Sequence, residues 1–151
     1  QVLGVFSVDL VETLAHVLQR LGSQHVLIVH GSDGLDEITI TGKTHIGELK
    51  NNTIQSYTIQ PEDFGFHSTP IQDIQVNDAE HAKAMLLSVL KNKSGAARDV
   101  VILNAGAAIY VAGVVDNLAA GITKAQKTIE SGAALKKLHE LVALSQKNAA
   151  Q

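Results

Sequence analysis

Apolar residues recur first at helical spacing and then in an unbroken run over the first 31 positions of the chain. After Ser7, which can cap a helix, they share one helical face, and Gly22 is placed to end that helix in a left-handed conformation. Residues 25–30 (HVLIVH) form a continuous apolar run, which is typical of a strand covered on both faces in a parallel sheet. The two together predict half of a β-α-β unit and therefore an α/β fold.

Three shorter segments follow, at residues 36–41, 44–50 and 53–60, separated by the turn formers Gly42-Lys43 and Asn51-Asn52. The first and third alternate apolar with polar residues, so the three predict a small antiparallel meander. Both prolines lie in the next stretch, which shows no sustained period up to Asn77 and indicates an ordered surface loop.

Helical spacing dominates the remainder of the chain. Asp78 is placed to cap one helix, and Asp116 is placed to cap a later helix that Gly132 ends. Between them, residues 97–113 are apolar on nearly every side and rich in alanine and glycine, which predicts a central buried helix with closely packed neighbours. A last helix follows Gly132.

The strand at residues 26–29 has no obvious partners in this pattern. A continuous apolar strand calls for parallel neighbours on each side, and the other candidate, residues 100–103, runs into helix-forming sequence without a turn. We therefore expect that the sheet is completed elsewhere and that the chain is one part of a larger domain or longer protein.

Composition narrows the class of protein. At 151 residues, with 45% hydrophobic and 18% charged residues, the chain fits one folded domain. The net charge of -3 and the scattered lysines and arginines argue against nucleic acid as a partner, and the absence of cysteine excludes disulfides and thiolate metal sites. The start does not resemble a secretory signal, and residues 100–115 are too short to cross a membrane, so we expect a cytoplasmic protein without a membrane partner.

An adjacent acidic pair, Asp36 and Glu37, is the most informative candidate site. The turn-forming stretch from Gly31 to Gly34 precedes it, and a turn there would let two neighbouring side chains converge. Two carboxylates at the carboxyl end of a buried strand suit Mg²⁺, which takes one or two protein carboxylates alongside water and substrate phosphates. The alternative is a solvated edge that discourages strand association, and on spacing alone it is the more frequent of the two.

Other polar residues carry weaker signals. The histidines show no metal-binding spacing, so we expect surface or packing roles for most of them, namely His16, His45, His67, His81 and His139. His30, which ends the buried strand, is expected to shape a loop through a backbone hydrogen bond, and Asn104 to pair with a buried backbone group. No nucleophile motif or phosphate-binding loop is present, so nucleophilic catalysis has no visible carrier.

Four motifs in order carry a resemblance to a known family. They are His30-Gly31 with 34–37 (GLDE), 61–65 (PEDFG), 103–105 (LNA) and 110–113 (YVAG). In this order and at these separations the chain resembles, from Gly4 to Leu144, the C-terminal part of anthranilate phosphoribosyltransferase. That family joins anthranilate to phosphoribosyl diphosphate in tryptophan biosynthesis.

The resemblance implies a fold and a place within it. It indicates that residues 1–151 form the C-terminal part of the large α/β domain of a nucleoside-phosphorylase-like phosphoribosyltransferase. One buried parallel strand, a small antiparallel meander and several C-terminal helices are expected. The family's N-terminal helical domain, through which it commonly forms homodimers, and its glycine-rich phosphate loop would lie outside this chain. The chain alone would then be inactive.

The resemblance also implies a site. Asp36 and Glu37 match the family's pair that holds the Mg²⁺ accompanying phosphoribosyl diphosphate. Gly31 and Gly34 would let the loop backbone pass close to metal and substrate. The chain departs from the family where a Gly-Gly-Asp stretch and a following Asn-Ala are usual, because it reads VNDAEHA from Val76 to Ala82. Two alternatives stay open: a non-catalytic binding module on the same scaffold, and a related pentosyltransferase with another aromatic or pyrimidine acceptor.

Overall fold

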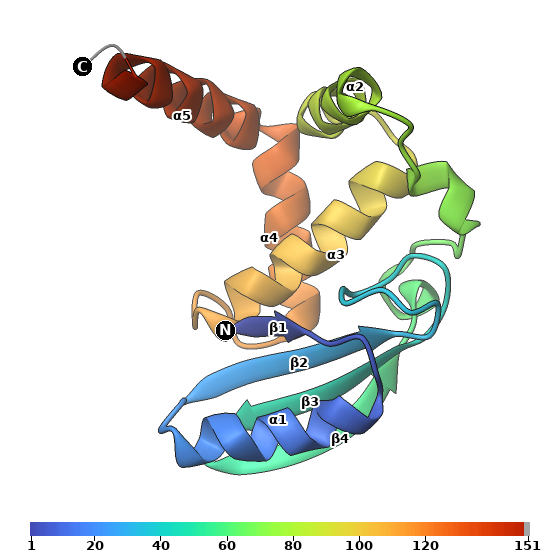
Figure 1. Ribbon diagram of the computed structural model, residues 1–151, viewed down its shortest axis with the longest axis vertical. Coiled ribbons are helices and arrows are strands. Elements are labelled where there is room, and N and C mark those ends of the chain that lie inside the picture. The colour runs from blue at the N-terminus through green and yellow to red at the C-terminus, as the bar shows by residue number, and fades with distance from the viewer. Residues whose placement is uncertain (150–151) are drawn as a thin grey trace.

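A computed structural model describes residues 1–149 as one sheet with helices on both of its faces (Figure 1). The elements in chain order are β1 (Val2–Gly4), α1 (Asp9–Arg20), β2 (His25–Gly31), β3 (Thr44–Lys50), β4 (Thr53–Ile59), two short 3₁₀ helices (Pro61–Phe64 and Ile71–Ile74), α2 (Ala79–Leu90), α3 (Ala96–Val111), α4 (Leu118–Glu130) and α5 (Ala133–Ala149). Helix α1 lies against one face of the sheet and α3 against the other, whereas α5 projects away from the sheet. The α/β class predicted from the sequence is confirmed.

The four strands are ordered β1-β2-β3-β4, so β2 lies inside the sheet. It pairs with β1 in parallel and with β3 antiparallel. The expectation of parallel neighbours on each side is therefore wrong, and the chain itself supplies both neighbours. The apolar run follows from coverage of both faces: Leu27 and Val29 pack toward α3, while Val26 and Ile28 pack toward α1, and all four side chains are 0% exposed.

The predicted meander has two strands instead of three. Strands β3 and β4 form a hairpin whose turn residues, Asn51 and Asn52, have φ of 51° and 61°, the pattern of a type I′ turn. The segment at residues 36–41 alternates like a strand but forms a loop, because its backbone groups pair outside the sheet. Thr39 N donates to the Thr44 hydroxyl at 3.0 Å, and the Ile40 carbonyl accepts from Thr69 N at 3.1 Å.

The helices follow the predictions closely, with two corrections at their starts. Val8, and not Ser7, occupies the N-cap position of the first helix, and Asn117 caps α4 in place of Asp116, accepting from a backbone N–H at 2.9 Å. Asp78 caps α2 as predicted, and Gly22 takes the expected left-handed conformation with φ 84°.

Helix α3 is the central buried helix that the sequence predicts. It packs closely on α4 because two glycines face each other: a Cβ added at Gly121 would lie 2.2 Å from the carbonyl oxygen of Gly106. Within residues 1–149, no helix is both long and apolar enough to cross a membrane.

Candidate functional site

The acidic pair lies on a tight loop that begins where β2 ends. Gly31 N donates to the Leu35 carbonyl at 2.8 Å, and Gly34 N donates to the Gly31 carbonyl at 2.9 Å. Gly34 has φ 93°, a backbone conformation that residues with a Cβ rarely adopt, so glycine is needed there. Gly31 is needed for space, since a Cβ there would lie 2.5 Å from a carboxylate oxygen of Asp33. The turn predicted ahead of the acidic pair is confirmed.

Asp33 holds this loop together through three hydrogen bonds. Its Oδ2 accepts from the hydroxyls of Thr39 at 2.5 Å and Thr41 at 2.7 Å, and its Oδ1 accepts from Leu35 N at 3.1 Å. Burial opposes ionisation, but the hydrogen bonds from Thr39, Thr41 and Leu35 outweigh it and hold the pKa of Asp33 below its usual value. Sequence reasoning missed this residue, although Asp followed by Gly is a signal for a side chain that bonds backbone two positions on.

Asp36 and Glu37 are held between β1 and α3. The Asp36 backbone packs so closely on Gly4 that a Cβ added at Gly4 would lie 1.6 Å from the Asp36 carbonyl oxygen. Directly after the pair, the Asn104 amide brackets Ile38, accepting from its N–H at 3.0 Å and donating to its carbonyl at 2.8 Å. The predicted pairing of Asn104 with buried backbone is confirmed. The loop therefore presents two exposed carboxylates from a fixed backbone.

The acidic pair carries uncompensated negative charge. No ion pair among residues 1–149 involves Asp36 or Glu37. Partial burial, together with the negative charge of Asp36, raises the pKa of Glu37 above its usual value. A divalent cation would relieve this repulsion, and carboxylate oxygens are ligands that Mg²⁺ prefers.

The donor set therefore fits a magnesium ion, provided that other ligands come from elsewhere. The part of the chain that the structure describes holds no cluster of three or more acidic or histidine side chains able to bind a metal. Mg²⁺ commonly keeps several waters and binds substrate phosphates in addition to one or two carboxylates. Two protein carboxylates are thus sufficient for a site that is completed by substrate.

Glu37 also lies at the edge of a groove of about 680 Å³ formed mainly by α2 and α3. The polar residues at this groove are Glu37 and Asn104, and the rest of its lining is apolar: Leu35, Ile74, Val76, Ala82, Met85, Leu86, Val89, Leu90, Ala97, Val100, Val101, Ala105 and Leu138. Asp36 does not line it, and neither does any lysine or arginine. The groove thus offers apolar contact next to one carboxylate, without a cation to hold phosphate.

The histidines take no part in this site. His30 Nδ1 lies 2.8 Å from the carbonyl oxygen of Val5, so it fixes the connection between β1 and α1. The predicted backbone hydrogen bond is present, on a different loop from the acidic one. The five histidines expected at the surface or in packing roles are exposed or half-buried, as predicted.

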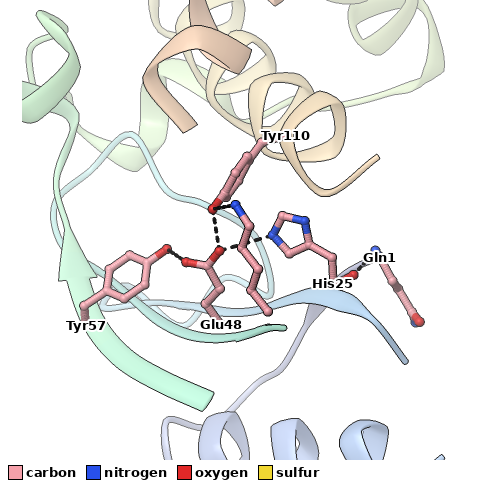
Figure 2. A network of polar contacts seen from close by, with 6 residues as sticks. Gln1, His25, Glu48, Tyr57 and Tyr110 are labelled. Atoms are coloured by element: carbon pink, nitrogen blue, oxygen red, sulfur yellow. Dashed lines mark hydrogen bonds and ion pairs between the residues drawn. The ribbon is translucent and has the colours of Figure 1, made fainter. Parts of the chain in front are cut away.

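A second polar cluster lies at the opposite end of β2. Figure 2 shows the Glu48 carboxylate accepting hydrogen bonds from Tyr57 at 2.8 Å and Tyr110 at 2.6 Å, with His25 Nε2 at 3.1 Å. Burial and contact with Glu48 raise the pKa of both tyrosines, although Lys50 partly offsets this at Tyr110, so the phenols stay protonated donors. Glu48 pairs with Leu27, four residues before Gly31, so it lies about 13 Å along the strand from the start of the acidic loop. It fastens α3 to the sheet.

Comparison with known proteins gives one consistent result. Residues 1–135 match the glycosyl transferase family, a/b domain. The anthranilate phosphoribosyltransferase of Nitrosomonas eutropha is 58% identical over 145 residues, which make up 96% of this chain and 42% of that protein. The anthranilate phosphoribosyltransferase of Laribacter hongkongensis is 53% identical over 150 residues, or 99% of this chain and 44% of that protein. The chain thus spans less than half the length of these curated relatives.

Solved structures give the same match. The crystal structure of anthranilate phosphoribosyltransferase from Thermus thermophilus superposes with a TM-score of 0.84 at 33% identity, covering 93% of this chain and 41% of that one. The Saccharomyces cerevisiae enzyme in complex with PRPP and Mg superposes with a TM-score of 0.79 at 27% identity, covering 91% and 40%. The same yeast enzyme is also known in complex with 4-fluoroanthranilate.

Proposed function

The chain belongs to the glycosyl transferase family, a/b domain, and from that premise we propose that it is part of an anthranilate phosphoribosyltransferase of tryptophan biosynthesis. The reaction forms a bond between the anthranilate nitrogen and the ribose carbon of phosphoribosyl diphosphate, and it breaks the bond from that carbon to diphosphate. The products are phosphoribosylanthranilate, diphosphate and a proton. Relatives at 53% and 58% identity that carry this name support the proposal.

The same proposal assigns residues 1–151 to the later part of the large α/β domain. The helical domain and the glycine-rich phosphate loop would come from the remainder of the protein, since the relatives are more than twice as long as the matched region. The groove beside Glu37 has no lysine or arginine to balance a diphosphate, which supports a phosphate-binding loop supplied by another part of the protein. We therefore expect the chain alone to be inactive. A cytoplasmic location and a homodimer formed through the helical domain stay predictions from the resemblance.

Within this enzyme, Asp36 and Glu37 are the residues that would hold Mg²⁺. The observation that carries the assignment is an acidic pair with no cationic partner among the described residues, where partial burial and then repulsion by Asp36 raise the pKa of Glu37. Bound Mg²⁺ would neutralise the diphosphate as it leaves, which lowers the barrier without a covalent intermediate. Gly34 and Gly31 serve this site by allowing the tight loop that presents both carboxylates.

The test is the double variant Asp36→Asn with Glu37→Gln in the full-length protein. We expect it to lose Mg²⁺-dependent consumption of anthranilate and phosphoribosyl diphosphate while remaining folded by circular dichroism. Asp9→Asn with Glu12→Gln removes the same two charges from the exposed side of α1 and should leave the rate unchanged. Normal turnover in the first variant would disprove the metal assignment.

One observation favours a related activity as the second candidate. Val76, which stands where the family pattern has glycine, lines the groove beside Glu37. A changed lining there fits a different aromatic or pyrimidine acceptor, or a binding module without catalysis. Assaying the full-length protein with a panel of acceptors separates the three, since anthranilate alone should react under the main proposal and none should react with a binding module.

A further inference from the structure

We propose that Asp33 is a positioning residue, which together with the hydroxyls of Thr39 and Thr41 fixes the backbone bend that presents Asp36 and Glu37 to their cation. This inference rests on the proposed function, and it adds three residues to the site that neither the motif nor the resemblance assigns. We call the three together the Asp33 staple.

The hydrogen bonds of the staple lie on both sides of the acidic pair in the sequence. The Asp33 carboxylate accepts from Leu35 N, just before the pair, at 3.1 Å, and from the hydroxyls of Thr39 and Thr41, just after it, at 2.5 and 2.7 Å. Residues 36 and 37 lie between these anchor points, so neither flank can shift without breaking a bond to a charged group. Such bonds are stronger than those between neutral groups. The staple therefore restricts the loop at the two residues that carry the proposed ligands.

The far side of the staple is itself fixed in the protein core. Thr39 is only 1% exposed, its N–H donates to the Thr44 hydroxyl at 3.0 Å, and its hydroxyl accepts from Thr41 N at 3.0 Å. Thr44 is the first residue of β3 and is fully buried. Asp33 thus ties the loop to the sheet through a buried threonine, which gives the exposed carboxylates a rigid support.

Asp33 is already satisfied in this arrangement and is not needed as a third metal ligand. Both of its oxygens accept hydrogen bonds, whereas no ion pair among residues 1–149 engages the acidic pair. Asp33 bonds neither proposed ligand directly and acts on both through the loop backbone, one step further away than the groups that hydrogen-bond metal ligands in other sites. Loss of such a group typically weakens metal binding by about 10- to 100-fold.

The experiment removes one hydroxyl and restores it. Thr39→Val keeps the shape of the side chain but deletes the donor, and Thr39→Ser returns the donor without the methyl group. Ser32→Ala is the matched control, since it deletes an exposed hydroxyl on the same loop that makes no hydrogen bond within residues 1–149. The variants are made in the full-length protein, next to the Asp36→Asn, Glu37→Gln double variant.

Two readouts are needed. Binding of Mn²⁺, used as a paramagnetic substitute for Mg²⁺, is measured by water-proton relaxation with phosphoribosyl diphosphate present and anthranilate absent, so that no turnover occurs. The Mg²⁺ concentration for half-maximal rate is then compared with the KM for anthranilate. We expect Thr39→Val to weaken both metal measures by roughly tenfold or more, with the KM for anthranilate unchanged. Thr39→Ser and Ser32→Ala should behave like the unmodified protein.

The outcomes separate this inference from the proposed function. If the double acidic variant loses Mn²⁺ while Thr39→Val binds it normally, the staple has no positioning role and the metal site stands. If the double acidic variant binds Mn²⁺ normally, the metal site itself is wrong and the inference is overturned with it. If Thr39→Val does not fold, Thr41→Val removes the second donor from a less buried position and is judged by the same two readouts.

Discussion

The close approach between β1 and the acidic loop gives the sharpest prediction. In Gly4→Ala, the new Cβ would lie 1.6 Å from the Asp36 carbonyl oxygen and 2.5 Å from its carbonyl carbon. An ordinary contact, such as the 3.4 Å that a Cβ at Gly42 would make with Ser32, is about 1.8 Å longer. The clashing atoms of Asp36 belong to the backbone and cannot rotate away as a side chain could. Either β1 or the loop must therefore move by most of the roughly 1.8 Å. The change therefore acts directly on the backbone of a proposed ligand.

The expected cost follows from that displacement. Overpacking in a well-packed region typically costs about 1–3 kcal/mol, and a clash between two backbone segments belongs at the upper end, so we expect Gly4→Ala to lose about 3 kcal/mol of unfolding free energy. Misplacement of a reacting group by about 1 Å can cost roughly 100-fold in rate, and we expect a loss of this order in the full-length enzyme.

The assay is urea unfolding for stability and Mg²⁺-dependent turnover for function. Gly42→Ala is the control, because its nearest contact is an ordinary 3.4 Å and its φ is not in the left-handed region. It should leave both measurements nearly unchanged. A Gly4→Ala protein with the stability and rate of the control would refute the claim that β1 fixes the position of Asp36.

Three further perturbations test other parts of the structure. Gly121→Ala should lose about 1–3 kcal/mol in urea unfolding, because its Cβ would meet the Gly106 carbonyl oxygen at 2.2 Å; an unchanged midpoint would contradict the close helix packing. Tyr110→Phe removes a donor to the Glu48 carboxylate and should cost about 1.5 kcal/mol or more by the same assay, whereas a neutral result would show that solvent replaces the bond. Burial and repulsion raise the pKa of Glu37 above its ordinary 4.5, so the free energy of unfolding should fall as pH rises from 4.5 through the raised pKa. Glu37→Gln should lack this fall when unfolding is measured across the same pH range. Equal pH dependence in both proteins would count against the repulsion.

Elements with one dominant pattern could be predicted from the sequence. The apolar face of α1 predicted an amphipathic helix packed on one side, and the apolar residues all around α3 predicted a buried central helix. The structure contains both helices. Residues 36–41 could not be predicted, because alternation also suits a buried loop whose backbone bonds go to side chains far along the chain. Asn104 lies 66 residues from Ile38, and no local pattern announces that contact. The antiparallel partner of β2 was hidden for a similar reason, since a strand buried by helices on both faces reads alike whichever way its neighbours run.

The candidate site divides in the same way. The turn before Asp36 was readable because glycine at position 34 is needed for a left-handed conformation. The staple around Asp33 was not, because its partners Thr39 and Thr41 look like ordinary strand residues until the fold returns their hydroxyls to the carboxylate. Residues that hold a site in place are thus harder to predict than residues that are exposed at it.

The Glu48 cluster has a consequence for local unfolding of the protein. A single carboxylate connects β3 to β4, to β2 and to α3, through Tyr57, His25 and Tyr110 (Figure 2). None of these four elements can detach without breaking a charge-assisted bond shared by the others. We therefore expect their amide hydrogens to exchange with solvent as one cooperative unit, and those of α5, which has no buried residue, to exchange independently of the sheet.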